Sequence, residues 1–429
     1  MNIVLITNTF TPHVGGVARS VERFAEEYRK KGHQVLVVAP QFPKAPQKEV
    51  DVVRIPAIQN FNTSDFSVAL PLSANLSETL DSFQPDIVHS QHPFLLGMTA
   101  VRIVRCRRLP LVFTHHTLYE QYTHYVPGDS PALKRFVIEL ATRYANLCDQ
   151  VFAPSDSIRD LIRKRGVESP VAVIPTGVKV EDFVNGDGLA FRLQQGIPKN
   201  AVIIGHVGRL APEKNLEFLA KSTAAYLNSN SQAYFLVVGC GPSEKAIRQV
   251  FAKNKLEERL HFCGILEPVQ LANALAAMDL FAFASKSETQ GMVLTEAMAA
   301  GLPVVAIDAP GVREVVKDKV NGRLISEETV AAFSSALQWV ISRSPDQIRD
   351  LKQAARKTAD NFSLSQTADQ ALAVYQSLKA KSVHQTIEGE KGWQQIIALI
   401  KAEWDIIKSV AQAGEEALHE NLFFEDDEH

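Results

Sequence analysis

Short apolar runs rich in β-branched residues alternate along the chain with longer segments in which apolar residues recur every three or four positions. The runs predict buried strands, and the amphipathic segments predict helices that cover them. In the first half of the chain, strands are predicted at 2–8, 34–40, 86–91, 110–116 and 171–176. Helices are predicted between them at 17–31, 94–107, 131–147 and 155–165.

The same rhythm restarts in the second half. Strands are predicted at 202–208, 234–239, 260–264, 280–285 and 303–308, again with intervening helices. Continuous apolar strands separated by helices are typical of parallel sheets that are covered on both faces. Two such series predict an α/β protein with two doubly wound, Rossmann-like domains facing a central cleft.

Turn-forming sequences suggest where these domains meet. VNGDG at 184–188 and GIPKN at 196–200 supply this chemistry, so we expect an N-terminal domain over 1–195 and a C-terminal domain over 196–361. A final helix is expected at 362–380, followed by an acidic extension over 381–429. Within that extension, 391–418 is predicted to form an amphipathic helix that packs on the protein body or on a second copy of the chain, with a helix at a membrane interface as the alternative.

Composition and charge narrow the function classes. The 429 residues carry 45 basic and 48 acidic side chains, and no DNA- or RNA-recognition motif is present, so a nucleic-acid partner is not expected. The four cysteines show no C-x-x-C spacing, which argues against a zinc ribbon. The sequence has no apolar run long enough for a spanning helix, and its opening MNIVLITNTF has no basic region and is too short for a signal peptide, so a cytoplasmic protein is expected.

A pair of glycines follows the first predicted strand. Gly15 and Gly16 open the helix at 17–31, where free amides and the helix dipole favour an anionic ligand. The dinucleotide pattern G-x-G-x-x-G is absent, which disfavours a dehydrogenase. A tight strand–helix turn without a ligand is the alternative explanation.

Two cations follow the strand at 202–208. Arg209 and Lys214 lie in GRLAPEKN, on a loop between strand and helix, where two positive charges can grip a diphosphate. Two solvated surface charges are the alternative. No G-x-x-x-x-G-K-[ST] sequence occurs, so a P-loop ATPase or kinase is excluded.

Two glutamates follow the strand at 280–285. Glu288 precedes a helix expected to start near Gly291, and Glu296 lies eight residues further on. The amides of Gly291, Met292 and Val293 would then be free to meet phosphate or sugar oxygens. Eight helical residues rise about 12 Å, more than the roughly 5–10 Å that separates the two carboxyl groups of a glycosidase. Separate contacts to sugar hydroxyls are therefore favoured over hydrolysis.

Histidines and tyrosines follow the strand at 110–116. His116 ends FTHH, and Tyr119, Tyr122 and Tyr125 come next. This set suits a sugar and an amphipathic acceptor, and the hydroxyls of the tyrosines are expected to stay solvated. The spacing of the histidines matches no recognised metal site, so no bound metal is predicted.

Together these motifs resemble those of the retaining glycosyltransferases of family 4, which have the two-Rossmann GT-B fold. The resemblance is carried by GGV at 15–17, HHT at 115–117, GRLAPEKN at 208–215 and the pair Glu288–Glu296. It implies transfer of a sugar from a nucleotide-sugar donor with retention at the anomeric carbon. It also implies that the helix at 362–380 crosses back to the N-terminal domain.

The resemblance further implies a role for each motif. Arg209 and Lys214 would neutralise the donor diphosphate, which Gly15 and Gly16 would approach from the N-terminal domain. Glu296 would hold the ribose, whereas Glu288 and the Gly291, Met292 and Val293 amides would hold the sugar. His116 would contact the sugar near the reacting carbon, and Ile265 would meet the base. No tightly bound cofactor is implied, and Mg²⁺ would at most stimulate the reaction.

Within the family, HHTLYEQYTHYVP resembles the bacterial diacylglycerol glucosyltransferases, which make monoglucosyldiacylglycerol. This implies UDP-glucose as donor and a membrane lipid as acceptor, with the enzyme bound peripherally to the inner face of the membrane. The basic cluster Arg102, Arg105, Arg107 and Arg108 could contact anionic head groups, or could be a solvated helix end. A family member with a soluble sugar or polyol acceptor is the alternative, and a nucleotide-sugar epimerase is a further one.

Overall fold

The computed structural model describes residues 1–13, 15–42, 45–46, 49–58, 68–69, 74–121 and 130–383. The chain divides into two compact units. The first comprises residues 1–175 together with the chain from Thr367 onward, and the second comprises Thr176–Gln366. The sequence-based expectation for the helix at 391–418 falls outside the described residues.

The first unit is built on a sheet of seven parallel strands, in the spatial order β3-β2-β1-β6-β7-β8-β9. Its strands are β1 (Asn2–Ile6), β2 (Gln34–Pro40), β3 (Val52–Ile55), β6 (Ile87–Ser90), β7 (Leu111–Thr114), β8 (Gln150–Ala153) and β9 (Val171–Val173). A two-stranded antiparallel pair, β4 (Ala57–Ile58) with β5 (Val68–Ala69), lies outside this sheet.

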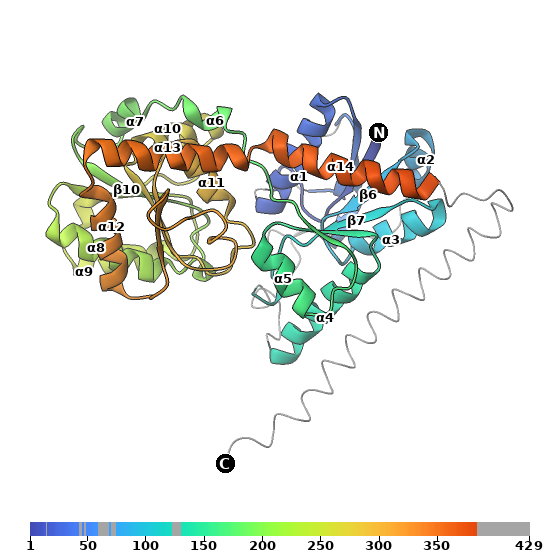
Figure 1. The fold of residues 1–429 in the computed structure, drawn as a ribbon, viewed down its shortest axis with the longest axis horizontal. Helices are drawn as coiled ribbons and strands as arrows, with labels where there is room; N and C mark the ends of the chain where they lie inside the picture. Colours follow the sequence, from blue (N-terminus) through green and yellow to red (C-terminus); the bar gives the residue numbers. More distant parts are fainter. Residues whose placement is uncertain are drawn as a thin grey trace, which may run out of the picture. The chain divides into compact units, whose positions relative to one another are not determined.

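Helices cover both faces of this sheet. They are α1 (Gly16–Lys30), α2 (Ala74–Phe83), α3 (Leu96–Arg107), η2 (Tyr119–Gln121), α4 (Pro131–Asn146), α5 (Asp156–Lys164) and α14 (Leu364–Val383). Figure 1 shows α14 running beside α1. Along β1, Ile3 packs in the apolar layer shared with α1 and α14, whereas Val4 packs in the layer shared with α2 to α5. Because successive side chains of a strand face opposite sides, both must be apolar, which explains the continuous apolar runs of the sequence.

The second unit repeats the plan with six parallel strands in the order β12-β11-β10-β13-β14-β15. The strands are β10 (Val202–Val207), β11 (Ala233–Val238), β12 (Leu260–Phe262), β13 (Leu280–Phe283), β14 (Val304–Ile307) and β15 (Gly322–Ile325). The longer helices are α8 (Leu216–Ser229), α9 (Glu244–Lys253), α10 (Pro268–Ala277), α11 (Met292–Ala299), α12 (Val330–Ile341) and α13 (Pro345–Asn361). The shorter ones are α6 (Glu181–Val184), α7 (Gly188–Gln194), η4 (Pro212–Lys214) and η5 (Glu257–Arg259). The prediction of two doubly wound α/β domains is confirmed.

Helix starts follow ordinary capping chemistry. The Ser155 hydroxyl accepts the amide of Ile158 at the start of α5, which satisfies one of the amides that a helix leaves without an acceptor. At α13, the hydroxyl of Ser344 accepts the amide of Gln347, and the Gln347 side chain accepts the Ser344 amide in return. Pro345 then fills the first helical position, where its missing N–H is not needed.

The boundary between the units differs from the expected one at 195/196. Helices α6 and α7 belong to the second unit, because Phe183 and Phe191 are buried in its core. A Cβ atom on Gly186 would lie 2.3 Å from the carbonyl oxygen of Ala272 on α10. The sequence VNGDG is therefore a tight turn pressed against α10 rather than a seam between domains.

Helix α14 contributes to the core of the first unit, although it follows the second unit in the sequence. Its residue Tyr375 is fully buried, and the Tyr375 hydroxyl lies 2.5 Å from His89 Nδ1 and 3.3 Å from the Tyr28 hydroxyl. Ion pairs at 2.8 Å join Lys31 to Asp369 and Asp86 to Lys379. The first unit is thus completed by residues from the far end of the described chain.

Replacing Tyr375 tests this dependence. Tyr375→Ala should lower the free energy of unfolding of the first unit by about 3–5 kcal/mol, the usual effect of deleting a buried aromatic ring. Tyr375→Phe should lower it by about 1–3 kcal/mol, because the ring remains while buried polar partners lose a hydrogen bond. Hydrogen exchange of the β1 and β6 amides, read by mass spectrometry, measures the effect locally. The exposed neighbour Gln376 offers the control Gln376→Ala, and equal protection in all three variants would contradict the prediction.

Candidate functional site

Each sheet has one place where the strand order reverses. In the first unit it lies between β1 and β6, and in the second it lies between β10 and β13. In doubly wound folds ligands bind beyond the carboxyl ends of the strands at such a reversal, because the loops that leave the two strands diverge there. The predicted site residues of the second unit come from the loops after β10, β12 and β13.

The loop after β10 carries the two predicted cations. The Arg209 side chain is 50% exposed, and its guanidinium pairs with the carboxylate of Glu213. Lys214 ends the short helix η4, and Asn215 follows in the left-handed region at φ +55° before α8 begins. Asparagine adopts this conformation more readily than most residues. The side-chain amide of Asn215 also donates a hydrogen bond to the carboxylate of Glu328 at 2.8 Å.

The motif that contains Lys214 and the motif that contains Glu288 are joined directly. The ammonium of Lys214 lies 2.6 Å from a carboxylate oxygen of Glu288, and each side chain is 17% exposed. Lys214 comes from the loop after β10 and Glu288 from the loop after β13, so the ion pair spans the reversal point of the second sheet. A cation and a carboxylate are thereby held together at the position where this fold places ligands.

The second glutamate lies deeper. Helix α11 begins at Met292, after Gly291 with φ +69°, and Glu296 on its first turns is 3% exposed. The amides at the start of a helix have no acceptor within it, as expected for Gly291, Met292 and Val293. Glu288 itself lies in the preceding loop, so helical rise does not fix its separation from Glu296, contrary to the spacing argument made from the sequence.

Residues that the sequence analysis missed hold this loop in place. The Gln290 amide bonds to both main-chain groups of Thr176, at 2.5 Å to its N–H and 2.6 Å to its carbonyl. Gly311 backs the same loop, since a Cβ there would lie 2.7 Å from the Gln290 nitrogen. Gln290 offers no sequence signal beyond its position between Glu288 and Gly291.

The two glycines of the sequence GCG at 239–241 allow three loops to pack closely. A Cβ on Gly239 would lie 1.9 Å from the Gly208 carbonyl oxygen, and a Cβ on Gly241 would lie 2.4 Å from that of Leu210. The Gly239 amide donates to the Gly264 carbonyl at 2.7 Å. Only glycine permits main chains to approach this closely, so the loops after β10, β11 and β12 form one packed edge. Ile265 follows Gly264 with its side chain 67% exposed.

A histidine lies beneath the same edge. His206, near the end of β10, is buried; its Nδ1 lies 3.1 Å from the Ala282 carbonyl, and its Nε2 has no partner among the described residues. Burial, with a smaller contribution from the nearby Lys214 charge, lowers its pKa to about 4, against the opposing effects of the Ala282 hydrogen bond and of Glu288. The ring is therefore neutral at pH 7.

In the first unit, the predicted glycines begin α1. Gly15 is the N-cap residue in an extended conformation, and Gly16 is the first helical residue. A Cβ on Gly16 would meet nothing within 4 Å, so the chain itself does not demand a glycine there. Val14, which precedes the two glycines, lies outside the described residues.

The loop after β6 is bound to the loop after β1. The Asn8 side chain accepts the amide of Leu96 and donates to the carbonyl of Phe94, and the Asn8 main-chain amide donates to His92 Nδ1 at 3.1 Å. These bonds cross the reversal point of the first sheet, where the strand order turns between β1 and β6. The sequence predicts Gln91 as the end of a strand at 86–91, whereas it is the first residue after β6 and lies in this crosslinked loop.

His116 follows β7 and lies beside this loop. Its Nε2 is 2.7 Å from Oε1 of Gln91. Burial holds the pKa of His116 well below its usual range, and the neighbouring histidines His92, His89 and His115 lower it further. A neutral imidazole is thus presented at the carboxyl edge of the first sheet.

Of the predicted tyrosines, Tyr119 is described, whereas Tyr122 and Tyr125 lie outside the described residues. The Tyr119 ring packs edge-on against Phe94, with ring centres 5.2 Å apart, and against His115. Its hydroxyl is buried without a partner in the described part of the chain, and burial raises its pKa above the usual value. The expectation of a solvated hydroxyl is therefore wrong for Tyr119.

The basic cluster is partly engaged within the first unit. Arg107 pairs with Asp81 of α2 at 2.6 Å and donates to the carbonyl of Ser77. Arg102 and Arg105 are half-buried on α3, and Arg108 is exposed as the left-handed residue that ends this helix. A role at an anionic membrane surface stays a prediction.

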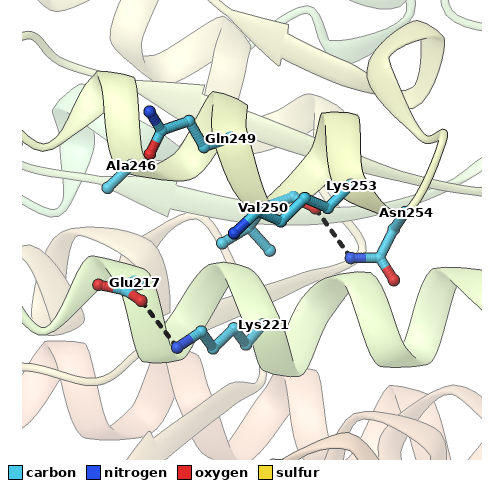
Figure 2. A pocket seen from close by; sticks show the side chains of 7 residues that line it. All are labelled: Glu217, Lys221, Ala246, Gln249, Val250, Lys253 and Asn254. Carbon is cyan, nitrogen blue, oxygen red and sulfur yellow. Dashed lines mark hydrogen bonds and ion pairs between the residues drawn. The ribbon is translucent and has the colours of Figure 1, made fainter.

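A surface hollow between α8 and α9 has a different character. Figure 2 shows Glu217 and Lys221 pointing toward one another, and they pair at 2.7 Å with both side chains largely exposed. Its lining is Glu217, Lys221, Ala246, Gln249, Val250, Lys253 and Asn254. None of these residues belongs to the loops at the reversal point.

Within the described ranges, no group of three or more His, Cys, Asp or Glu side chains could hold a metal ion. In the same part of the chain, no helix is both long and apolar enough to cross a bilayer. The prediction of metal-independent activity therefore rests on the sequence argument and awaits a test.

Comparison with known proteins decides the family. Residues 14–182 match the Glycosyltransferase Family 4 profile, and residues 190–358 match the profile of Glycosyl transferases group 1. The alpha-monoglucosyldiacylglycerol synthase of Streptococcus pneumoniae is 30% identical over 330 residues, which cover 76% of this chain and 75% of the relative. The chain is a family 4 glycosyltransferase. The resemblance found in the sequence is confirmed, and with it the retaining glycosyltransferase activity.

Other relatives of this glycosyltransferase differ in the names of their donors. A GDP-mannose-dependent alpha-mannosyltransferase of Corynebacterium glutamicum is 28% identical over 80% of this chain and 81% of the relative. The solved structure of Anabaena HepE in complex with UDP superposes with a TM-score of 0.72 at 22% identity, covering 88% of this chain and all of that one. The GT-B fold of the glycosyltransferase is thereby confirmed.

The buried histidines of the glycosyltransferase predict how its stability depends on pH. Burial lowers the pKa of His89 and His92 to about 3 and that of His115 to about 4, whereas an unfolded histidine binds a proton near pH 6.5. Between these values the unfolded chain holds more protons, so the free energy of unfolding should fall as the pH falls below about 6.5. The slope should reach about 1.4 kcal/mol per pH unit for each histidine.

Urea unfolding at pH 7, 6 and 5 measures this slope. His92→Asn is the matched variant, because its side-chain oxygen can still accept the Asn8 amide while the titrating group is gone. It should lose one histidine's share of the pH dependence. A slope that is identical in the variant, or stability that rises on acidification, would show that these rings are not neutral in the fold.

Proposed function

We propose that this glycosyltransferase moves glucose from UDP-glucose to diacylglycerol and so makes monoglucosyldiacylglycerol. The observation that supports a nucleotide-sugar donor is the Lys214–Glu288 ion pair at the reversal point of the second sheet. The name of the Streptococcus pneumoniae relative supports the lipid acceptor, and the UDP in the Anabaena structure supports the nucleotide.

The ion pair suits the junction between diphosphate and sugar. In a nucleotide sugar the terminal phosphate is bonded to the anomeric carbon, so a group that binds phosphate and a group that binds sugar hydroxyls must be neighbours. Lys214 and Glu288 are 2.6 Å apart and supply one of each. Arg209, half exposed on the same loop, can add a second charge to the diphosphate. Glu296, further along α11, is assigned to the ribose, and Ile265 to the base.

In the proposed reaction, the bond between the anomeric carbon and the phosphate oxygen breaks, and UDP leaves with the bonding electrons. The acceptor hydroxyl oxygen forms the new bond on the same face of the sugar, and its proton passes to the departing phosphate. Arg209 and Lys214 stabilise the charge that develops on the diphosphate. No protein base is needed for this step, and neutral His116 contributes a polar contact near the reacting carbon.

The acceptor side is assigned to the first unit. Gly15 and Gly16 would approach the donor from this unit, and the apolar faces of Tyr119 and Phe94 offer a surface for the lipid's glycerol end. Tyr122 and Tyr125 are proposed to extend that surface. Exposed Arg108, with Arg102, Arg105 and Arg107 on α3, is proposed to meet anionic lipid on the inner face of the membrane. A second copy of the chain is proposed to bind, if at all, through 391–418.

Product analysis tests the proposal. The purified full-length protein is supplied with UDP-glucose, UDP-galactose or GDP-mannose, each with vesicles of phosphatidylglycerol and diacylglycerol or with a soluble polyol such as inositol phosphate. Glucosyldiacylglycerol from UDP-glucose, still made in the presence of EDTA, is the expected product. Transfer from GDP-mannose alone would overturn the donor assignment, transfer to the polyol alone would overturn the lipid assignment, and conversion of UDP-sugar without any acceptor would indicate an epimerase.

Removing the proposed diphosphate ligands should impair catalysis strongly. Arg209→Ala and Lys214→Ala should each lower kcat/KM by at least about a hundredfold, the scale of one lost contact to developing charge. Lys221→Ala is the control, because Lys221 is an exposed lysine of the same unit that pairs with Glu217 away from the site. Steady-state kinetics compare the three variants, and near-normal turnover without Arg209 and without Lys214 would remove the diphosphate role.

The two glutamates should separate the ends of the donor. Glu296→Gln should weaken the affinity for free UDP, because its carboxylate is assigned to the ribose. Glu288→Gln should leave UDP affinity within a few fold while lowering kcat/KM for the sugar nucleotide. Isothermal titration with UDP and steady-state kinetics measure both, and the reverse pattern would mean that the two ends are interchanged.

A further inference from the structure

We propose that Gln91 is the positioning residue of His116: its amide oxygen fixes the proton on Nε2 of the imidazole and keeps the ring neutral. The inference rests on the proposed function for the part that His116 plays in transfer. It does not rest on it for the state of the ring, which can be measured without any substrate.

Gln91 is itself held firmly. It is the first residue after β6, its main-chain amide donates to the carbonyl of Ile6 at 2.9 Å, and the residue is 4% exposed. His116 is the second residue after β7, the neighbour of β6 in the sheet, and its main-chain amide donates to the Thr114 carbonyl. Parallel pairing therefore brings the glutamine and the histidine to the same edge, where their side chains meet at 2.7 Å.

The nitrogen of the Gln91 side-chain amide determines how this group is oriented. Its nitrogen lies 3.5 Å from the main-chain carbonyl oxygen of His89, a long hydrogen bond to a group that can only accept. The amide nitrogen therefore faces His89, and the oxygen faces His116. A ring nitrogen opposite an oxygen acceptor must carry the hydrogen, so Nε2 of His116 is protonated.

The surroundings explain why an amide, and not a carboxylate, stands at position 91. The titratable groups on the packed elements are His89 on β6, His92 beyond it, and His115, Tyr119 and Glu120 after β7, with Arg165 after α5 and Tyr375 on α14. His89 is engaged by Tyr375 and by the Thr114 hydroxyl, and Glu120 pairs with Arg165 at 2.7 Å. The Gln91 amide that contacts Nε2 of His116 carries no charge and so, unlike a carboxylate, does not favour protonation of the ring.

A neutral ring with a fixed proton suits the transfer step. A cationic ring beside the anomeric carbon would oppose the positive charge that develops there when the bond to the phosphate breaks. A neutral ring in one tautomer presents a fixed pattern of donor and acceptor to the sugar instead. Gln91 acts on the reaction only through His116.

The charge variant Gln91→Glu provides the sharpest test. A carboxylate at this position should raise the pKa of His116 by about 1–3 units, the usual effect of an opposite charge at hydrogen-bond distance. The kcat of the variant should then fall on acidification through pH 7 to 6, whereas that of the parent should change little. The affinity for UDP should stay the same, because the nucleotide is assigned to the second unit. Gln34→Glu, which adds the same charge at the exposed amino end of β2, is the control.

Two uncharged variants separate positioning from folding. Gln91→Met fills the same space without an amide, and Gln91→Asn retains the amide but is shorter by one methylene. Both should lower kcat about tenfold or more with little change in KM for the donor. Unchanged exchange protection of the β6 and β7 amides would show that the fold survives, and a loss of protection that accounts for the lost kcat would assign Gln91 a merely structural role.

The ring state is read directly by NMR of protein labelled with ¹⁵N-histidine, with His116→Asn to assign the signals. Expected are an Nε2–H tautomer in the parent, titration of His116 at higher pH in Gln91→Glu, and no such shift in Gln34→Glu. An Nδ1–H tautomer in the parent, or unchanged titration in Gln91→Glu, would overturn the proposal. Absence of all transfer activity would defeat the proposed function while leaving this measurement decisive.

Discussion

Parallel pairing of strands is the constraint on which both units depend. Within each of the two large sheets, all strands end at the same edge, because they are parallel. The strand order reverses once in each sheet, between β1 and β6 in the first and between β10 and β13 in the second. Residues far apart in sequence are brought together where the loops of the two flanking strands diverge. Lys214 and Glu288 are separated by 74 positions, yet they form one ion pair because their strands are neighbours.

The two reversal points are closed by different chemistry. In the first unit, Asn8 spans the reversal with neutral hydrogen bonds to main-chain groups, which a ligand cannot easily replace. In the second, Lys214 and Glu288 span it with charges that a phosphate and a sugar hydroxyl could share. The first reversal point is thus closed by uncharged contacts beside Gln91 and His116, whereas the second is closed by a pair of opposite charges.

The sequence predicted the fold class, the family and most strands, because buried parallel strands are continuously apolar. It missed β3, β8 and β15, whose sequences VVRI, QVFA and GRLI each carry a polar residue within or before the short apolar run. It also placed the domain boundary twenty residues late, at 195 instead of 175. That error arose because Gly186 serves close packing on α10, which only the fold reveals. The structural roles of Gln91 and Gln290 could not be predicted for the same reason. An isolated glutamine belongs to no sequence motif, and its role depends on the distant histidine or main chain that it contacts.

Gln290 also gives the donor loop a connection to the point where the chain passes from one unit to the other. Its amide is bonded to Thr176, the first residue of the second unit, while its neighbours in sequence are the proposed ligands of the sugar. Any rearrangement that moves this loop relative to Thr176 must break both of these hydrogen bonds. A single side chain therefore ties the position of the loop to the residue at which the second unit begins.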